Sequence, residues 1–322
     1  ARFCMRLVVA LGAAGVLVSG LCQRTSAAPS DTPPSLAAAG HPGFLSPHAD
    51  PVAIHDEFVF VVNTAADTLD VIDSATRQIV RRIAVGLQPV SVAVRPDGRE
   101  AWVANHVSDS VSVIDIAAGS TTQFAVVATI QDFDPLTKST RFDEPVGIAF
   151  AESATGGFKA YVALSSENRI AVIDAASRMV TSHLEIPAQD PRAMAVRNGR
   201  LYVAAFESNN QTQLSGGRGD AIDGDLVTFD AWEHSIFNNN VLSLGAVLDI
   251  IKHPEVPDRD LFVFDTTNDQ LVETVSGVGT LLYGLAVDNS GRVFVTQTDA
   301  RNDVNGRAGT QGHGLAELEN RP

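Results

Sequence analysis

Cysteine is almost absent from this chain of 322 residues. The two cysteines, Cys4 and Cys22, both lie within the first 28 residues. The rest of the chain therefore has no disulfide, no thiol nucleophile and no C-x-x-C-H haem-attachment motif. We expect its fold to be stabilised by packing alone.

Positive charge is also scarce. The chain has 23 Lys and Arg against 38 Asp and Glu, a net charge of −15. Nucleic acids and anionic membranes need a basic surface, so the composition argues against both as partners. The sequence also lacks G-x-S-x-G, H-E-x-x-H and P-loop motifs, and no residue can be named as catalytic.

The amino terminus has the features of a signal peptide. Arg2 and Arg6 precede an apolar run over 7–21, and small residues follow at 26–28. The run is short for a membrane span. We predict a signal peptide over 1–28, export to the periplasm or cell exterior, and no membrane span after cleavage; an uncleaved anchor is the alternative. A Pro- and Ala-rich linker is predicted over 29–57.

Residues 58–99 form the first copy of a repeat. They hold four apolar runs, FVFVV, LDVID, IVRRIAV and VSVAV, separated by turn residues. This pattern predicts four strands of one meandering sheet. Asp73 begins one turn, where its carboxylate can accept a backbone N–H, and Pro96-Asp97-Gly98 suits another.

The repeat recurs along the chain. Its first run reappears at AWVAN, AYVAL, LYVAA and RVFVT, and the marker valines are Val62, Val103, Val162, Val203 and Val295. The steps between them are 41, 59, 41 and 92 residues. A period near 41 with insertions fits a four-stranded propeller blade of about 40–45 residues.

The motifs resemble the YVTN family of bacterial β-propeller repeats. The matching residues are Val61-Val62-Asn63, Val71-Ile72-Asp73, Thr76, Val85-Gly86, Pro89 and Pro96-Asp97-Gly98. The resemblance implies an all-β, WD40/YVTN-like propeller over 58–322, with four-stranded antiparallel blades. About four to five blades are expected in an incomplete ring, as in a fragment of a longer chain. Another all-β meander, such as a sandwich, is the alternative.

Two long insertions interrupt the repeat, one within 117–144 and one near 207–259. Long insertions on a repeat scaffold often carry function. The second contains Asp220, Asp223 and Asp225, and a similar acidic stretch near the carboxyl end contains Asp299, Asp303 and Asn305. These are the candidate calcium ligands, because hard cations favour such oxygens; solvated turns are the alternative. The acids of the first insertion, such as Asp132, Asp134, Asp143 and Glu144, leave the same two alternatives.

Two other sets of polar residues are expected to be structural. Asn63 and Asn105 end equivalent strands, which favours turn capping. His41, His48 and His55 are seven residues apart, but prolines at 42, 47 and 51 prevent a helix from aligning them.

Three functions remain open. The first is an exported binding or scaffold domain without its own catalytic centre or cofactor, which holds a protein or small molecule on a propeller face. The second, by analogy with similar propellers, is the propeller part of a periplasmic oxidoreductase, quinoprotein or c-type cytochrome-linked, whose haem would lie in a domain beyond residue 322. The third is a metal-assisted, lactonase-like hydrolase. Propellers host unrelated activities, so fold alone does not decide among them.

Overall fold

The protein is described from a computed structural model, which divides into two units, 1–44 and 45–322. Only the second unit contains described residues. They are 46–207 and 258–298, together with the backbone of three short strands at 212–215, 241–243 and 247–252. Within these ranges the regular structure is β-sheet, apart from one 3₁₀ turn at Thr64–Ala66. None of the described residues forms a helix that could cross a membrane.

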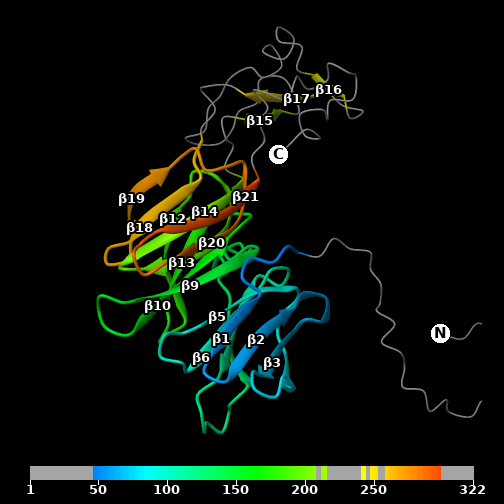
Figure 1. The fold of residues 1–322 in the computed structure, drawn as a ribbon, viewed down its shortest axis with the longest axis vertical. Coiled ribbons are helices and arrows are strands. Elements are labelled where there is room, and N and C mark those ends of the chain that lie inside the picture. The colour runs from blue at the N-terminus through cyan, green and yellow to red at the C-terminus, as the bar shows by residue number, and fades with distance from the viewer. Residues whose placement is uncertain (1–45, 208–211, 216–240, 244–246, 253–257, 299–322) are drawn as a thin grey trace, which may run out of the picture. The chain divides into compact units, whose positions relative to one another are not determined.

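Three antiparallel sheets of four strands and one sheet of six strands form the blades of a β-propeller (Figure 1). Blade I contains β1 (Val52–His55), β2 (Phe58–Asn63), β3 (Thr68–Asp73) and β4 (Ile79–Ala84). Blade II contains β5 (Pro89–Val94), β6 (Glu100–Asn105), β7 (Ser110–Asp115) and β8 (Ala125–Ile130). Blade III contains β9 (Pro145–Glu152), β10 (Phe158–Leu164), β11 (Arg169–Asp174) and β12 (Met179–Glu185).

Blade IV differs from the others by an insertion. It contains β13 (Gln189–Arg197), β14 (Arg200–Glu207), β18 (Leu261–Asp265) and β19 (Gln270–Val275). Because β14 pairs directly with β18, residues 208–260 are inserted between two neighbouring strands. The insertion holds the small sheet of β15 (Thr212–Ser215), β16 (Val241–Ser243) and β17 (Val247–Lys252). A hairpin of β20 (Leu281–Val287) and β21 (Val293–Thr298) follows and extends the sheet of blade IV to six strands, because Leu281 of β20 pairs with Glu207 of β14.

The sequence repeat is out of phase with the blades. The four runs of residues 58–99 were predicted to form one sheet, and this prediction is wrong. The fourth run is β5, which pairs with β6 of the next blade and not with β4. The first strand of blade I is instead β1, within the stretch predicted to be a linker. Each blade therefore starts with the strand that ends the sequence repeat.

Apolar side chains from both sheets fill each boundary between neighbouring blades. Phe60 and Val103 lie between blades I and II, Trp102 and Phe150 between II and III, and Tyr161 and Phe262 between III and IV. The rings of Trp102 and Phe150 meet edge to face, with centroids 5.2 Å apart. Burying one such side chain fully contributes about 1.5–3 kcal/mol, so these boundaries account for much of the stability.

The first strands of the blades lie so close together that they require small residues. Equivalent positions are occupied by Ser91 in β5, Gly147 in β9 and Ala193 in β13. The Ser91 hydroxyl donates to the carbonyl oxygen of Val146 in the next blade. A Cβ on Gly147 would lie 2.0 Å from the carbonyl oxygen of Arg192. The blades are therefore held at a fixed distance around the axis.

Candidate binding surface on the loop face

The two ends of the blades carry different connections. We call the end at which β5, β9 and β13 begin the loop face, and the opposite end the turn face. The 131–144 segment enters β9 at the loop face, and the 208–260 insertion leaves β14 and returns to β18 there, since Gln189 at the start of β13 pairs with Glu207 at the end of β14. The 131–144 part of the first predicted insertion and the whole of the second therefore emerge from the loop face, whereas the first part of the 117–144 stretch connects β7 to β8 at the turn face.

The 131–144 loop has internal order. Asp132 forms an ion pair with Arg141, with an N···O distance of 3.0 Å. Asp134 accepts hydrogen bonds from the backbone N–H groups of Leu136 and Thr137, both at 2.8 Å, which lowers its pKa. These two carboxylates are therefore committed to the loop's own conformation.

Other acids of this loop lie against blades II and III. The Glu144 N–H donates to the Asp109 carboxylate at 3.2 Å, and His106 Nε2 lies 3.9 Å from Glu144 Oε2. Burial raises the pKa of Asp109, and repulsion from Asp143 and Glu144 adds to this. Asp143 accepts a hydrogen bond from the Ser166 hydroxyl at 2.8 Å. The acids make a negative rim, and no group of three or more metal-ligating side chains is found among the residues that the structure describes.

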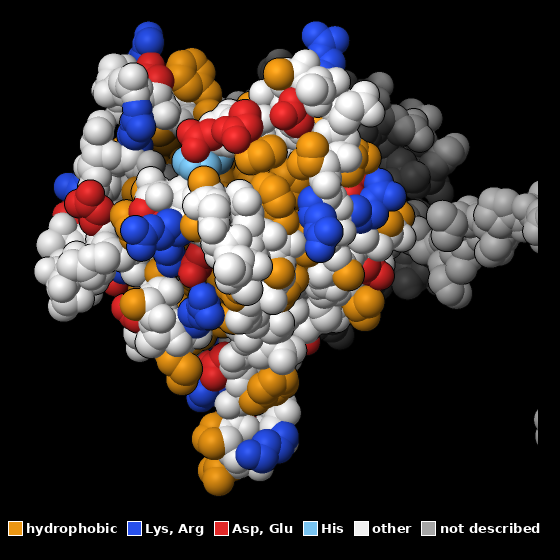
Figure 2. Space-filling view, turned by 90° about the horizontal axis from the view of Figure 1, so that it is seen from below, with side chains coloured by type: hydrophobic (Ala, Val, Ile, Leu, Met, Phe, Trp, Pro, Cys, Tyr) orange, Lys and Arg blue, Asp and Glu red, His pale blue; other side chains and the backbone are white. Residues whose placement is uncertain are grey.

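Large apolar side chains are exposed beside this rim. Leu87 and Val107 are each 51% exposed and adjacent, since the Val107 N–H donates to the Leu87 carbonyl oxygen at 3.2 Å. Phe133 and Leu136 of the 131–144 loop are 47% and 90% exposed. The described turns of the turn face contain no exposed large apolar residue. On the face shown in Figure 2, hydrophobic side chains likewise lie next to acidic ones and a histidine.

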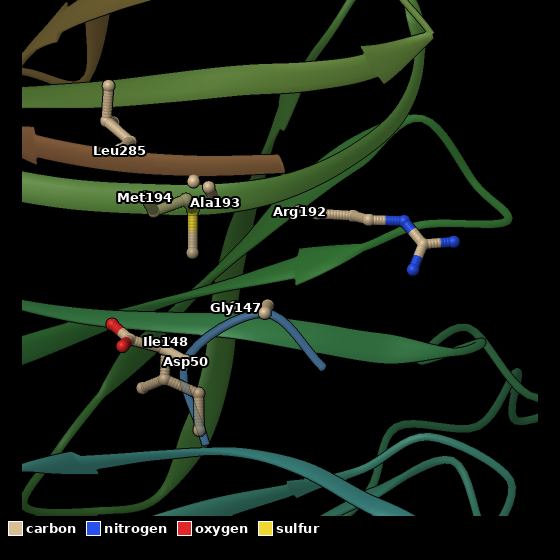
Figure 3. A pocket seen from close by; sticks show the side chains of 9 residues that line it. Asp50, Gly147, Ile148, Arg192, Ala193, Met194 and Leu285 are labelled. Atoms are coloured by element: carbon tan, nitrogen blue, oxygen red, sulfur yellow. The ribbon is translucent and has the colours of Figure 1, made fainter. Parts of the chain in front are cut away.

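A small cavity lies at the axis, where the first strands meet (Figure 3). Its volume is about 130 Å³, and its lining includes Asp50, Ile148 and Met194. Met194 points toward Ile148, whereas the guanidinium of Arg192 points away from the cavity. Burial raises the pKa of Asp50. Since pockets for drug-sized ligands measure about 300–1,000 Å³, this cavity suits water or a very small ligand.

Arg192 belongs instead to a cluster at the loop end of blade IV. Its Nη2 lies 2.6 Å from Asp190 Oδ2, and its guanidinium carbon lies 4.7 Å from the centre of the Phe206 ring. The rings of Phe206 and Tyr283 meet edge to face at 5.2 Å, and Tyr283 is 47% exposed. Burial, and then Asp190, raise the pKa of Glu207. The sequence pattern did not indicate this cluster, because its members come from three strands.

Some of the residues predicted to form sites are described by the structure, and others are not. Asp220, Asp223, Asp225, Asp299, Asp303 and Asn305, the candidate calcium ligands, lie outside the described residues. The capping role of Asn105 is confirmed: its carbonyl oxygen accepts the Gly86 N–H at 3.1 Å, and its amide donates to Ser110 and Ser112. His41 also lies outside the described residues, and His48 bonds to Thr64 at 2.6 Å.

Comparison with known proteins agrees with the fold. The YNCE-like β-propeller family model matches residues 16–149, which fits the predicted YVTN-type propeller. A search of curated protein sequences gave no match.

Among solved structures, hydrazine synthase of Kuenenia stuttgartiensis is 19% identical, with a TM-score of 0.43, over 80% of this chain and 76% of that one. The WD40 β-propeller domain of Doa1 is 10% identical, with a TM-score of 0.45, over 76% of this chain and 58% of that one. The chain is a β-propeller protein, and its first part matches the YNCE-like family of propellers.

Proposed function

We propose that this protein is an exported, protein-binding platform and that the loop face is its binding surface. The observation that carries the proposal is the exposure of Leu87, Val107, Phe133 and Leu136 on consecutive loops of one face. Exposed apolar groups with a polar rim are typical of protein interaction sites. The rigid blades beneath would hold these side chains in fixed positions.

The charge beside these residues indicates the kind of partner. Asp109, Asp143 and Glu144 border the apolar group, and the whole chain carries −15. A partner should therefore offer an apolar surface flanked by Lys or Arg, since complementary charge favours association. Export is part of the proposal and is supported by the apolar run over 7–21 after Arg2 and Arg6.

The proposal can be tested with two single substitutions. Leu136→Asp places a charge at the tip of the 131–144 loop, and Met179→Asp does the same at a residue that is 64% exposed on the outer strand β12. The immobilised protein would be used to isolate partners from the exported proteins of the source cell, and the dissociation constant of each would be measured by calorimetry.

We expect Leu136→Asp to weaken binding by about tenfold or more, as for a residue central to an interface, and Met179→Asp to leave it unchanged. Both residues are exposed, so thermal unfolding should match the wild type in each case. A partner that is lost only with Met179→Asp, or the absence of any partner, would contradict the proposal.

A further inference from the structure

The connection between the third and fourth strands ends in the same way in every blade, although it is longer in blade II (116–124) than in blade III (175–178). One residue of each connection has a left-handed backbone, with φ between 59° and 62°, and these residues are Arg77, Phe124, Arg178 and Asp269. The backbone N–H of each donates, at 2.7–2.8 Å, to the carbonyl oxygen of the aspartate that ends the third strand. The shared geometry places basic, aromatic and acidic side chains at one equivalent position.

A second equivalent position lies at the start of the second strand. It is the residue that pairs across the sheet with the same aspartate: Phe58 with Asp73, Glu100 with Asp115, Lys159 with Asp174, and Arg200 with Asp265. The register therefore defines this position independently of any sequence alignment. Its side chains differ in every blade.

The two positions meet across each blade boundary. Phe58 of blade I contacts Phe124 of blade II, with ring centroids 5.2 Å apart and planes at 84°. Glu100 of blade II binds Arg178 of blade III, with an N···O distance of 2.9 Å. Lys159 of blade III binds Asp269 of blade IV at 2.7 Å. The three boundaries thus use an aromatic pair, an acid–base pair and a base–acid pair.

We propose that these pairs are recognition contacts that determine which blade packs beside which. Each incorrect combination carries a penalty. Asp269 against Glu100 and Arg178 against Lys159 would bring like charges together. Arg178 or Asp269 against Phe58, or Lys159 against Phe124, would lose water and the ion pair made at its own boundary; Glu100 against Phe124 would lose Arg178 and keep only its ion pair with Arg95 of the same blade. The blades have similar backbones and apolar faces, so a repulsive element is needed to distinguish them.

The surroundings make the charged contacts sensitive to their partner. The side chains of Glu100 and Lys159 are only 12% and 11% exposed, so little water screens them. An aromatic residue two positions along the strand holds each carboxylate: Trp102 Nε1 donates to Glu100 at 2.9 Å, and the Tyr161 hydroxyl donates to Asp269 at 2.6 Å. Both pairs are therefore fixed in geometry as well as in charge.

Arg77 extends the rule to the outer side of blade I. Its side chain makes no ion pair among the described residues. The equivalent second-strand residues that follow Lys159 are basic, namely Arg200 in blade IV and Arg292 before β21. Either arginine would repel Arg77. The rule therefore requires that any sheet packed against the Arg77 side of blade I carry an acidic residue at the second-strand position equivalent to Glu100.

The proposal can be tested by giving the II/III and III/IV boundaries the same order of acidic and basic residues. Lys159→Glu combined with Asp269→Arg copies the Glu–Arg order of the II/III boundary onto III/IV. Arginine occupies the equivalent turn position in blades I and III, so the left-handed backbone accepts it. The matched control, Lys159→Arg with Asp269→Glu, keeps the base on the second strand and the acid in the turn. Each variant would be unfolded in urea, diluted, and separated by size-exclusion chromatography.

We expect the copied pair to refold with about threefold more oligomer than the control, since the arginine introduced by Asp269→Arg could then also dock on Glu100 of another molecule. Equal monomer yields for the two double variants would overturn the proposal. The single variant Asp269→Arg should lower the urea midpoint, and adding Lys159→Glu should restore at least about half of the loss. A single variant as stable as the wild type would also overturn it, whatever the refolding yields.

Discussion

Gly147 should be among the least replaceable residues of the propeller. A Cβ at this position would lie 2.0 Å from the carbonyl oxygen of Arg192 in the next blade. Ordinary carbon–oxygen contacts need about 3.4 Å, so β9 and β13 would have to separate by more than about 1 Å. The obstructing atom belongs to the backbone, and no side-chain rotation can relieve the contact.

The cost of Gly147→Ala can be estimated from overpacked cores. Inserting a methyl group into a closely packed site costs about 1–3 kcal/mol, and more where the backbone must move. We therefore expect a loss of about 3 kcal/mol in the free energy of unfolding. With an m value of about 3 kcal/mol/M in urea, the midpoint measured by Trp fluorescence should fall by about 1 M.

Gly157→Ala is the matched control for this substitution. Gly157 precedes β10 at the turn face, where an added Cβ has no atom within 4 Å, although its φ of 78° disfavours a side chain. The cost there comes from the backbone alone, about 1 kcal/mol. If Gly147→Ala lost no more stability than Gly157→Ala, the close approach of β9 and β13 would be refuted.

Two further predictions concern polar residues in turns and loops. Asn105→Ala should cost about 2 kcal/mol in thermal unfolding, because the buried amide serves the Gly86 N–H and two serine hydroxyls. Asn63→Ala should cost less, because Asn63 is only partly buried and its amide bonds to the side chains of Thr68 and Asp70. Acid should also destabilise the fold: hydrogen bonds from Ser290 and Arg292 lower the pKa of Asp288 to about 2, and Ser177 lowers that of Asp174, both from the usual 3.8. Their contribution is complete above about pH 4 and is lost as the pH falls toward about 2, so the urea midpoint should decline over this range.

Much of the fold could be predicted from the sequence because the repeated motifs specify strands and turns locally. Asp73 caps its turn as expected, since its carboxylate accepts the Thr76 N–H at 2.7 Å. The blade boundaries could not be predicted in the same way. The link between β4 and β5 is as short as the turns within a sheet, and the apolar pattern of β5 suits pairing with either neighbour. Only the position of the axis decides which strand β5 joins.

The candidate surface was partly predictable. The spacing of the marker valines indicates both insertions, but the emergence of 131–144 and 208–260 on one face depends on strand direction. The pairing of Leu87 with Val107 joins loops from two connections and leaves no periodic pattern in the sequence. The recognition contacts do leave a signal: the residue before the motifs AWV and AYV changes from Glu100 to Lys159 while its neighbours remain similar. A position whose residue changes while the rest of the repeat stays similar therefore indicates a role that differs between copies.

Apart from Asp134, whose pKa is lowered within the 131–144 loop, the carboxylates with shifted pKa values at the two faces differ in physical role. On the turn face, hydrogen bonds from neighbouring groups lower the pKa values of Asp73, Asp174, Asp265 and Asp288, so these acids are committed to holding turns. The acids whose pKa is raised, Asp50, Asp109 and Glu207, lie at the loop face or beside its axis, where burial disfavours their charge. A cationic partner that approaches such a carboxylate stabilises its ionised form, so binding would offset the cost of burial. The same end of the blades thus offers apolar contact and carboxylates that a basic partner would stabilise, while the other end is already satisfied by its own backbone.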